Sequence, residues 1–104
     1  RVILLEKNPS LGRKLLMTGG GRCNITNNKP IKQLLTFFNN KNFLKHSFYT
    51  FTNEDLFSLF DFDFIEEDDN RILPETEKSG DVLKILTESL DDVVIKYQIP
   101  NALT

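Results

Sequence analysis

Arg1-Val-Ile-Leu-Leu-Glu6 opens the chain and predicts a strand that ends in a carboxylate. A continuous apolar run with β-branched members is typical of a strand covered on both faces, as in a parallel sheet. Two further signals follow at once, the basic turn Gly12-Arg-Lys14 and the loop Thr18-Gly-Gly-Gly-Arg-Cys-Asn24. Together the three segments indicate an α/β fold, because a buried strand followed by a glycine-rich bend is common there.

The bulk composition limits the partners that we expect. The chain has 104 residues, a net charge of −2 and a pI of about 5.3, which argues against a protein that binds nucleic acid through counterion release. No apolar run approaches the ~20 residues of a membrane helix, so no membrane partner is expected. Cys23 is the one cysteine, which excludes an internal disulfide and favours a reducing cytoplasm.

The first 24 residues carry most of the chemistry. A carboxylate at the end of a strand, such as Glu6, can accept the hydroxyl protons of a ribose, although acids also end many strands without a ligand. Glycines let the backbone approach a ligand closely and turn its N–H groups toward an anion, and Arg22 can add a bidentate phosphate contact. Arg13 and Lys14 would lie beside such a phosphate or would simply be solvated. The alternative for the glycine loop alone is a flexible hairpin tip.

Other reactive side chains are weaker candidates. Cys23 beside Arg22 is a candidate redox thiol, but a lone cysteine is more often an inert small residue. His46 lies in a phenylalanine-rich segment and is predicted to be structural. The acidic run over 66–69 is predicted to be a solvated turn. With one cysteine and one histidine the sequence has no metal-ligand spacing, and we expect no metal.

The rest of the chain predicts short alternating elements. The expected helices cover 11–16, 31–38, 41–48, 52–61 and 80–90, and the expected strands cover 62–66, 71–73 and 93–97. Ser10 and Ser79 are expected N-caps. Thr52 and Asp55 are expected to form a capping box. All nine phenylalanines lie between Phe37 and Phe64, either as a core of small helices or as a surface that packs on another domain or lines an apolar pocket.

These segments resemble the BaiN/YhiN-like flavoproteins, which are NAD(P)/FAD-dependent or aminoacetone-oxidase-like oxidoreductases. The resemblance is carried by Val2–Asn8, Leu11–Leu16 and Thr18–Asn27, and it continues at Asn70-Arg-Ile-Leu-Pro74. Position 70 is Asn where the family usually has Gly, and Leu73 stands in place of a usual Phe. The resemblance implies part of a Rossmann-like FAD-binding domain with short helices and a small β-hairpin, incomplete over 1–104.

The resemblance also implies the cofactor, the partners and the site. It implies FAD as cofactor, with NAD(P)H as a candidate electron donor, and as partners an unknown small-molecule substrate and the remainder of the same flavoprotein. A glycine fingerprint is expected upstream of Arg1, so this segment alone is expected to bind FAD weakly or not at all. No catalytic residue is singled out. The implied cofactor-binding residues are Glu6, Lys7, Arg13, Lys14, Thr18, Gly19, Gly20, Gly21, Arg22, Cys23 and Asn24.

Two alternatives remain open from the sequence. In the first, the chain is a non-catalytic remnant or interaction module whose Gly-Arg loop serves a generic anion or a partner protein. In the second, Arg13, Lys14 and Arg22 bind a phosphate without a flavin.

Overall fold

The structure is a computed structural model that describes residues 1–100. The chain divides into two compact units, each considered by itself. The first unit combines residues 1–23 with the segment that begins at Thr76, and the second unit is Asn24–Glu75.

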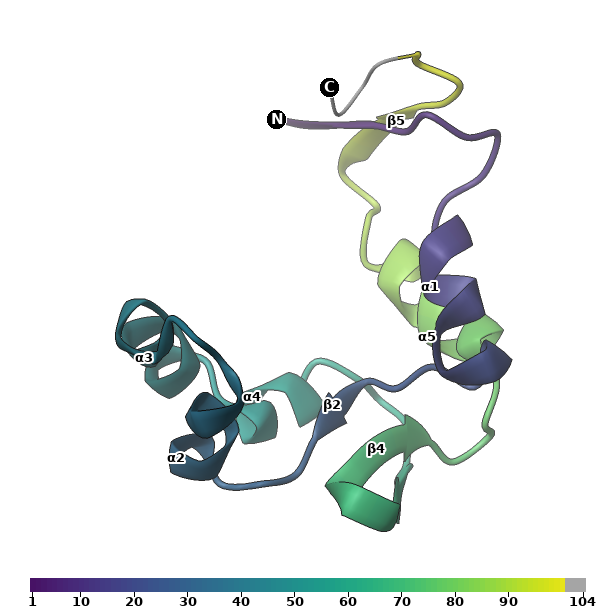
Figure 1. Cartoon of the computed structure of the whole chain (residues 1–104). Helices are drawn as coiled ribbons and strands as arrows, with labels where there is room; N and C mark the ends of the chain where they lie inside the picture. Colours follow the sequence, from purple (N-terminus) through teal and green to yellow (C-terminus); the bar gives the residue numbers. More distant parts are fainter. Residues whose placement is uncertain (101–104) are drawn as a thin grey trace. The chain divides into compact units, whose positions relative to one another are not determined.

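A pair of parallel strands forms the sheet of the first unit. Strand β1 (Val2–Leu5) pairs with β5 (Val93–Lys96), and Val2 lies opposite Val93 (Figure 1). Parallel neighbours require a crossover connection, which here includes the helices α1 (Arg13–Met17) and α5 (Ser79–Glu88). The predicted α/β class and the first and last strands are therefore confirmed.

The burial predicted for β1 is wrong within the described residues. Val2, Ile3 and Leu5 are 60%, 50% and 47% exposed, and only Leu4 is partly shielded. The physical reason is that β5 is the one strand beside β1 in the described part of the chain, so the other edge and much of both faces of β1 lack cover there.

The start of α1 depends on glycine rather than on serine. Its N-cap is Gly12 in the left-handed region at φ 75°, so the predicted cap at Ser10 is wrong. A Cβ at Gly12 would also lie 2.9 Å from Cδ2 of Leu83, so a larger residue would force the Leu83 side chain of α5 to shift. The positive φ is the constraint that selects glycine, and it fixes where the basic residues of α1 begin.

Helix α5 is tied to α1 by a hydroxyl. The N-cap of α5 is Lys78, and Ser79 is its first residue, so the predicted cap at Ser79 is also wrong. The Ser79 hydroxyl instead donates to the Leu16 carbonyl at 2.9 Å. Val82, 2% exposed, anchors the apolar face of the helix.

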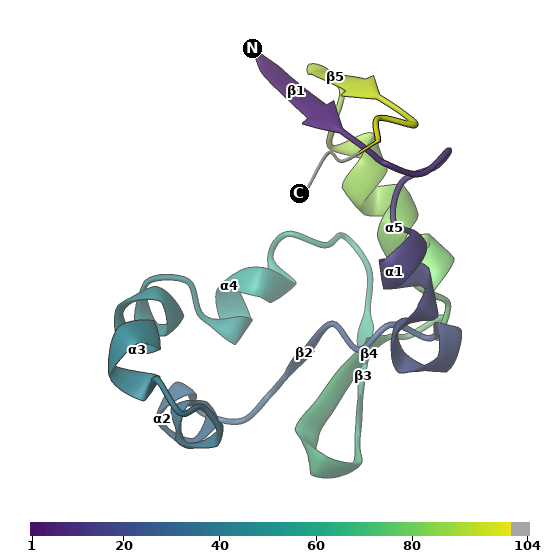
Figure 2. The ribbon, with the colours of Figure 1, turned by 45° about the horizontal axis from the view of Figure 1, so that its top comes forward.

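The second unit joins a small antiparallel sheet to short helices (Figure 2). The strand order is β2-β4-β3. The predicted hairpin is confirmed, with a 3-10 turn at 68–70 between its strands. The elements are β2 (Thr26–Asn27), α2 (Ile31–Leu34), the 3-10 turn η2 (Leu35–Phe37), α3 (Lys41–Thr50), α4 (Asn53–Phe57), β3 (Phe64–Glu67) and β4 (Arg71–Pro74).

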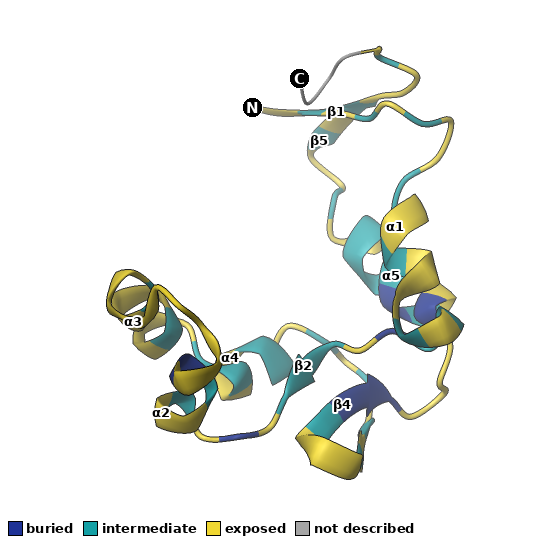
Figure 3. Cartoon of the chain, in the orientation of Figure 1, coloured by how far each residue is buried: buried dark blue, intermediate teal, exposed yellow. Residues whose placement is uncertain are grey.

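The centre of this sheet is its best-buried part. Ile72 and Leu73 of β4 are 4% and 0% exposed, and β4 ends in the buried colour in Figure 3. The predicted capping box of Thr52 and Asp55 is confirmed, although α4 ends at Phe57 rather than near residue 61.

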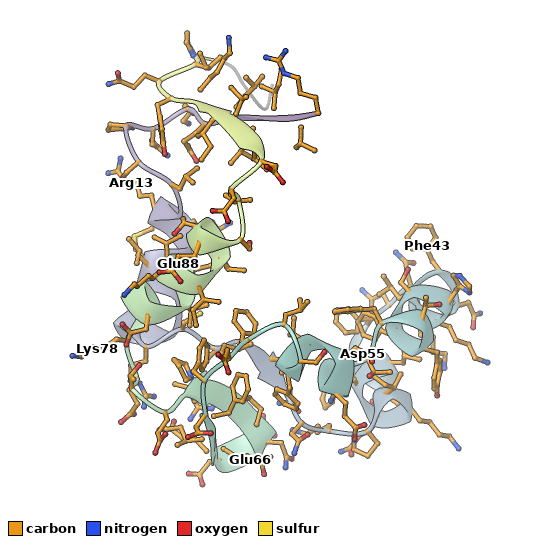
Figure 4. The ribbon with its side chains drawn as sticks, turned by 180° about the vertical axis from the view of Figure 1, so that it is seen from behind. Arg13, Phe43, Asp55, Glu66, Lys78 and Glu88 are labelled. Carbon is orange, nitrogen blue, oxygen red and sulfur yellow. The ribbon has the colours of Figure 1, made fainter. Side chains whose placement is uncertain are left out.

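The phenylalanines divide between the two sequence-based interpretations. Four rings cluster between the end of α4 and the start of β3, with centroids 4.9–6.3 Å apart: Phe57, Phe60, Phe62 and Phe64. In contrast, Phe37 is 68% exposed and Phe43 is 84% exposed, and Figure 4 shows Phe43 projecting from α3. The core interpretation therefore holds for the cluster and fails for these two rings.

Candidate functional site

The glycine loop is a tight left-handed turn. Gly19, Gly20 and Gly21 have φ values of 58°, 67° and 91°, which residues with a Cβ rarely adopt. A Cβ on Gly20 or on Gly21 would meet no atom within 4 Å. Packing therefore does not require glycine at these two positions. The backbone conformation does, and it leaves an open face along which a ligand can approach the main chain.

Backbone hydrogen bonds close the turn. The N–H groups of Arg22 and Cys23 donate to the carbonyls of Gly19 and Thr18, at 3.3 and 3.0 Å. The Thr18 hydroxyl donates to the Leu15 carbonyl at 2.6 Å, which ties the turn to the end of α1. Cys23 also has a positive φ of 64° and is 5% exposed. A thiol so buried is shielded from soluble oxidants, which does not favour the redox interpretation of Cys23.

Arg22 extends from the turn to an acid on the other segment of the first unit. Its Nη1 donates to Oε1 of Glu77 at 2.7 Å, and both side chains are partly exposed. Glu77 could not be identified from the sequence, because 55 residues separate it from Arg22. Its positive φ of 56° marks the backbone as unusual, but no residue type at this position signals that conformation.

Glu6 lies directly after β1, at the carboxyl end of the parallel pair. Its N–H donates to the Lys96 carbonyl at 2.8 Å, which extends the ladder by one residue. One carboxylate oxygen, Oε1, accepts the Asn8 N–H at 2.8 Å. The other oxygen has no hydrogen bond within residues 1–100. The carboxyl edge of parallel strands is where α/β proteins bind ligands, so the position suits a ribose hydroxyl.

The predicted residues form a row rather than a cluster. Strand β1 and the glycine turn lie at opposite ends of α1, as both Figure 1 and Figure 2 show. Helix α1 has five residues, which is about 7.5 Å of helix. Arg13 and Lys14 are exposed at its start, and Lys7 is exposed between β1 and α1. The structure thus groups Arg22 with the glycines, and it places Glu6 apart from them.

A row of this kind suits an extended ligand better than a single phosphate. A dinucleotide has a nucleobase with its ribose at one end, a pyrophosphate in the middle and a second ring system at the other end. A carboxylate before α1, two cations at its start and an open glycine turn after it follow one another here in a compatible order. Asn24 is exposed just beyond the turn, at the start of the second unit.

No three histidine, cysteine, aspartate or glutamate side chains within residues 1–100 gather as metal ligands would. Within the same described range, no helix is long and apolar enough to cross a membrane.

The parallel β1–β5 pair, its helical crossover and the glycine turn define a Rossmann-like α/β protein. The comparison with known families agrees. The family model of the HI0933-like protein Rossmann domain matches residues 1–104, and the chain belongs to this family. It is also similar to the ribosomal RNA dihydrouridine synthase of Escherichia coli (strain K12), with 39% identity over 59 residues. That alignment covers 57% of this chain and 14% of the relative, so the chain spans a small part of the relative's length.

Proposed function

We propose that the protein carrying these residues is an FAD-dependent oxidoreductase of the BaiN/YhiN type. The observation that carries the proposal is the left-handed glycine turn, whose Gly20 and Gly21 leave open space where side chains would stand. Membership of a Rossmann-domain family supports it.

The residues present fit such a cofactor. Glu6 would bind the adenosine ribose through the carboxylate oxygen that Asn8 does not use. Arg13 and Lys14 would compensate the negative charge of the pyrophosphate. The stretch from Thr18 through Asn24, with Arg22, would follow the pyrophosphate or flavin region.

The flavin supplies the electron transfer when bound, with NAD(P)H as the candidate electron donor. The chain's own residues bind and orient the cofactor. The turn from Gly19 to Gly21 holds backbone N–H groups in place, and Arg22 supplies a fixed positive charge. The described residues single out no catalytic acid or base, so their contribution to the reaction is to hold the cofactor.

The test uses the full-length protein. We expect the purified protein to be yellow and to show flavin absorbance. Glu6→Gln removes the negative charge of the acceptor, and we expect FAD affinity to fall by roughly tenfold or more, because hydrogen bonds to charged groups are worth about 1.5–3 kcal/mol. Glu88→Gln is the matched control, since Glu88 is exposed on α5 (Figure 4) and should leave affinity unchanged. A colourless protein that takes up no added FAD would contradict the proposal.

A second candidate function concerns the substrate. The relative named above is a ribosomal RNA dihydrouridine synthase, so reduction of uridine in RNA is a candidate reaction for the whole protein. The alternative is a small-molecule substrate, which the net charge of −2 favours. The dihydrouridine content of ribosomal RNA separates the two. RNA from cells that lack the gene should lose dihydrouridine, and the full-length gene should restore it. An unchanged content would leave the small-molecule candidate.

A further inference from the structure

We infer that the second unit carries a binding surface for single-stranded RNA on α2 and α3. This surface, called the lysine strip here, consists of Lys32, Lys41, Asn42, Lys45, His46 and Tyr49. The inference rests on the proposed function in one respect: RNA as the substrate class comes from the second candidate reaction. Its physical evidence comes from the second unit by itself and involves neither the glycine turn nor FAD.

Charge along the sequence is strongly segregated. Between Asn24 and Asn53 the chain has four lysines and no aspartate or glutamate. The first 53 residues hold nine of the 13 basic residues and one of the 15 acids. The net charge of −2 therefore averages a basic half and an acidic half, which conceals a local electrostatic footprint of the kind nucleic-acid surfaces have.

The structure gathers these lysines around two open hollows. The first hollow, about 310 Å³, is lined by Lys32, Lys41 and Lys45 with Tyr49 and neighbouring residues. The second, about 440 Å³, is lined by Lys45, His46 and Tyr49, among others. Both hollows share Lys45 and Tyr49, so the two hollows lie next to each other along α3. Among the described residues, no acidic side chain lines either hollow.

The lysines of the strip are exposed, unlike the fourth lysine of this segment. Lys29 is 8% exposed and bonds the Asp69 carboxylate at 2.6 Å, so we leave it out of the surface. Helix α3 is drawn mostly in the exposed colour in Figure 3. Its first turn holds no acid, and Lys41 adds positive charge to the positive end of the helix. A lysine at the positive end of a helix destabilises the free protein through repulsion. The same positive charges attract the phosphates of a bound nucleic acid.

Tyr49 distinguishes RNA from a merely acidic partner. Tyr49 is 51% exposed and lines both hollows, beside three lysines in the first and beside Lys45 in the second. Surfaces that bind single strands combine a basic groove with aromatic rings on which bases stack, each worth about 1–3 kcal/mol. An acidic protein or an anionic lipid surface would use the lysines without requiring the ring.

The experiment measures binding of a fluorescein-labelled, mixed-sequence single-stranded RNA of 20 nucleotides to the full-length protein at several salt concentrations. The strip variant is Lys32→Gln/Lys41→Gln/Lys45→Gln. We expect affinity to fall by at least about tenfold and the salt slope to shrink by about 2, since each single-strand phosphate contact contributes about 0.7. The control is Lys78→Gln/Lys84→Gln, which removes two exposed lysines of the first unit and should leave both quantities unchanged. Circular dichroism verifies that the variants fold.

Tyr49→Leu is the second variant. It should weaken RNA binding by about fivefold or more while leaving the salt slope unchanged, because stacking releases no counterions. Equal RNA binding by wild type and strip variant would overturn the inference. So would an unaffected Tyr49→Leu variant together with equally tight, strip-dependent binding of polyglutamate or of phosphatidylserine vesicles. Flavin absorbance of the same samples separates the FAD proposal from the lysine-strip proposal. If RNA binding depends on the strip but the protein holds no flavin, only the FAD proposal is contradicted. If the protein holds flavin but RNA binding does not depend on the strip, only the lysine-strip proposal is contradicted.

Discussion

Arg22 and Glu77 form a 2.7 Å ion pair that joins the glycine turn to the segment leading into α5. The pair fixes the guanidinium beside the turn although 55 residues separate the partners. Neither side chain is deeply buried, with 35% and 45% of their surfaces exposed. The pair therefore acts chiefly by orienting Arg22, since exposed pairs contribute only about 0–1 kcal/mol to stability.

Replacing Glu77 should have a small effect on stability and a larger effect on cofactor binding. For Glu77→Gln we expect the free energy of unfolding to fall by at most about 1 kcal/mol, because water screens the pair. FAD affinity should fall less than in Arg22→Gln, since the guanidinium remains and only its anchor is lost. Urea unfolding and FAD titration of the full-length protein measure both quantities.

A double-mutant cycle provides the control for this pair. The coupling between positions 22 and 77 should disappear in about 1 M salt, where the screening length is about 3 Å. Glu75→Gln, an exposed acid of the second unit, should leave FAD affinity unchanged. An Arg22→Gln variant with wild-type FAD affinity would remove Arg22 from the site.

Alanine at Gly20 should be costly, whereas alanine at Gly80 should not. Gly20 has a φ of 67°, where a Cβ costs about 1–2 kcal/mol. Gly80 lies in α5 with nothing within 4 Å of its Cβ position, so Gly80→Ala should be neutral or stabilising by up to about 1 kcal/mol. The added methyl group at Gly20 also enters the open face, so Gly20→Ala should lower FAD affinity as well. Thermal unfolding and FAD titration of Gly20→Ala and Gly80→Ala measure both effects. Equal unfolding temperatures and equal FAD affinities of the two variants would contradict the prediction.

Local signals in the sequence were enough to predict several elements of the structure. The run Val2–Leu5 predicts a strand because its pattern is contained in four residues. Thr52 and Asp55 predict a capping box because the geometry involves only three residues of separation. The glycine turn is also predictable, since consecutive glycines exclude regular structure.

Signals that depend on distant partners were not available from the sequence. The pairing of Val2 with Val93 and the bond of Arg22 to Glu77 both join segments far apart in the chain. The hydroxyl of Ser79 does not cap α5, and it bonds the Leu16 carbonyl of α1 instead. Each case requires knowledge of which segments meet, which neither propensity nor spacing contains.

Removing the capping hydroxyl should destabilise α4. The Thr52 Oγ1 accepts the Asp55 N–H at 3.2 Å, and the Asp55 carboxylate accepts the Thr52 N–H at 2.8 Å. Thr52→Ala should lower the free energy of unfolding by about 1 kcal/mol. Thr87→Ala is the control, because its hydroxyl only donates to the Lys84 carbonyl of its own helix. Equal unfolding midpoints in urea for the two variants would contradict the assignment.

Asp69 should make the second unit sensitive to acid. The hydrogen bond from Lys29, followed by its charge, holds the pKa of Asp69 below the ordinary value of 3.8. Around these two pKa values the carboxyl group of Asp69 therefore binds more protons in the unfolded chain than in the folded chain. The stabilisation is complete above the ordinary pKa of 3.8 and is lost as the pH falls through the lower pKa of folded Asp69.

Asp69→Asn tests this linkage with little steric change, because asparagine tolerates the φ of 63° found at Asp69. The difference in urea midpoint between wild type and Asp69→Asn should be largest near neutral pH and should shrink steadily below about pH 4. Asp68→Asn is the control, because it removes a charge from the same turn but keeps the Lys29 contact. The difference in urea midpoint between wild type and Asp68→Asn should therefore not include the contribution of that contact. If the difference between wild type and Asp69→Asn is the same at neutral and acidic pH, the Lys29 contact does not stabilise the charged carboxylate.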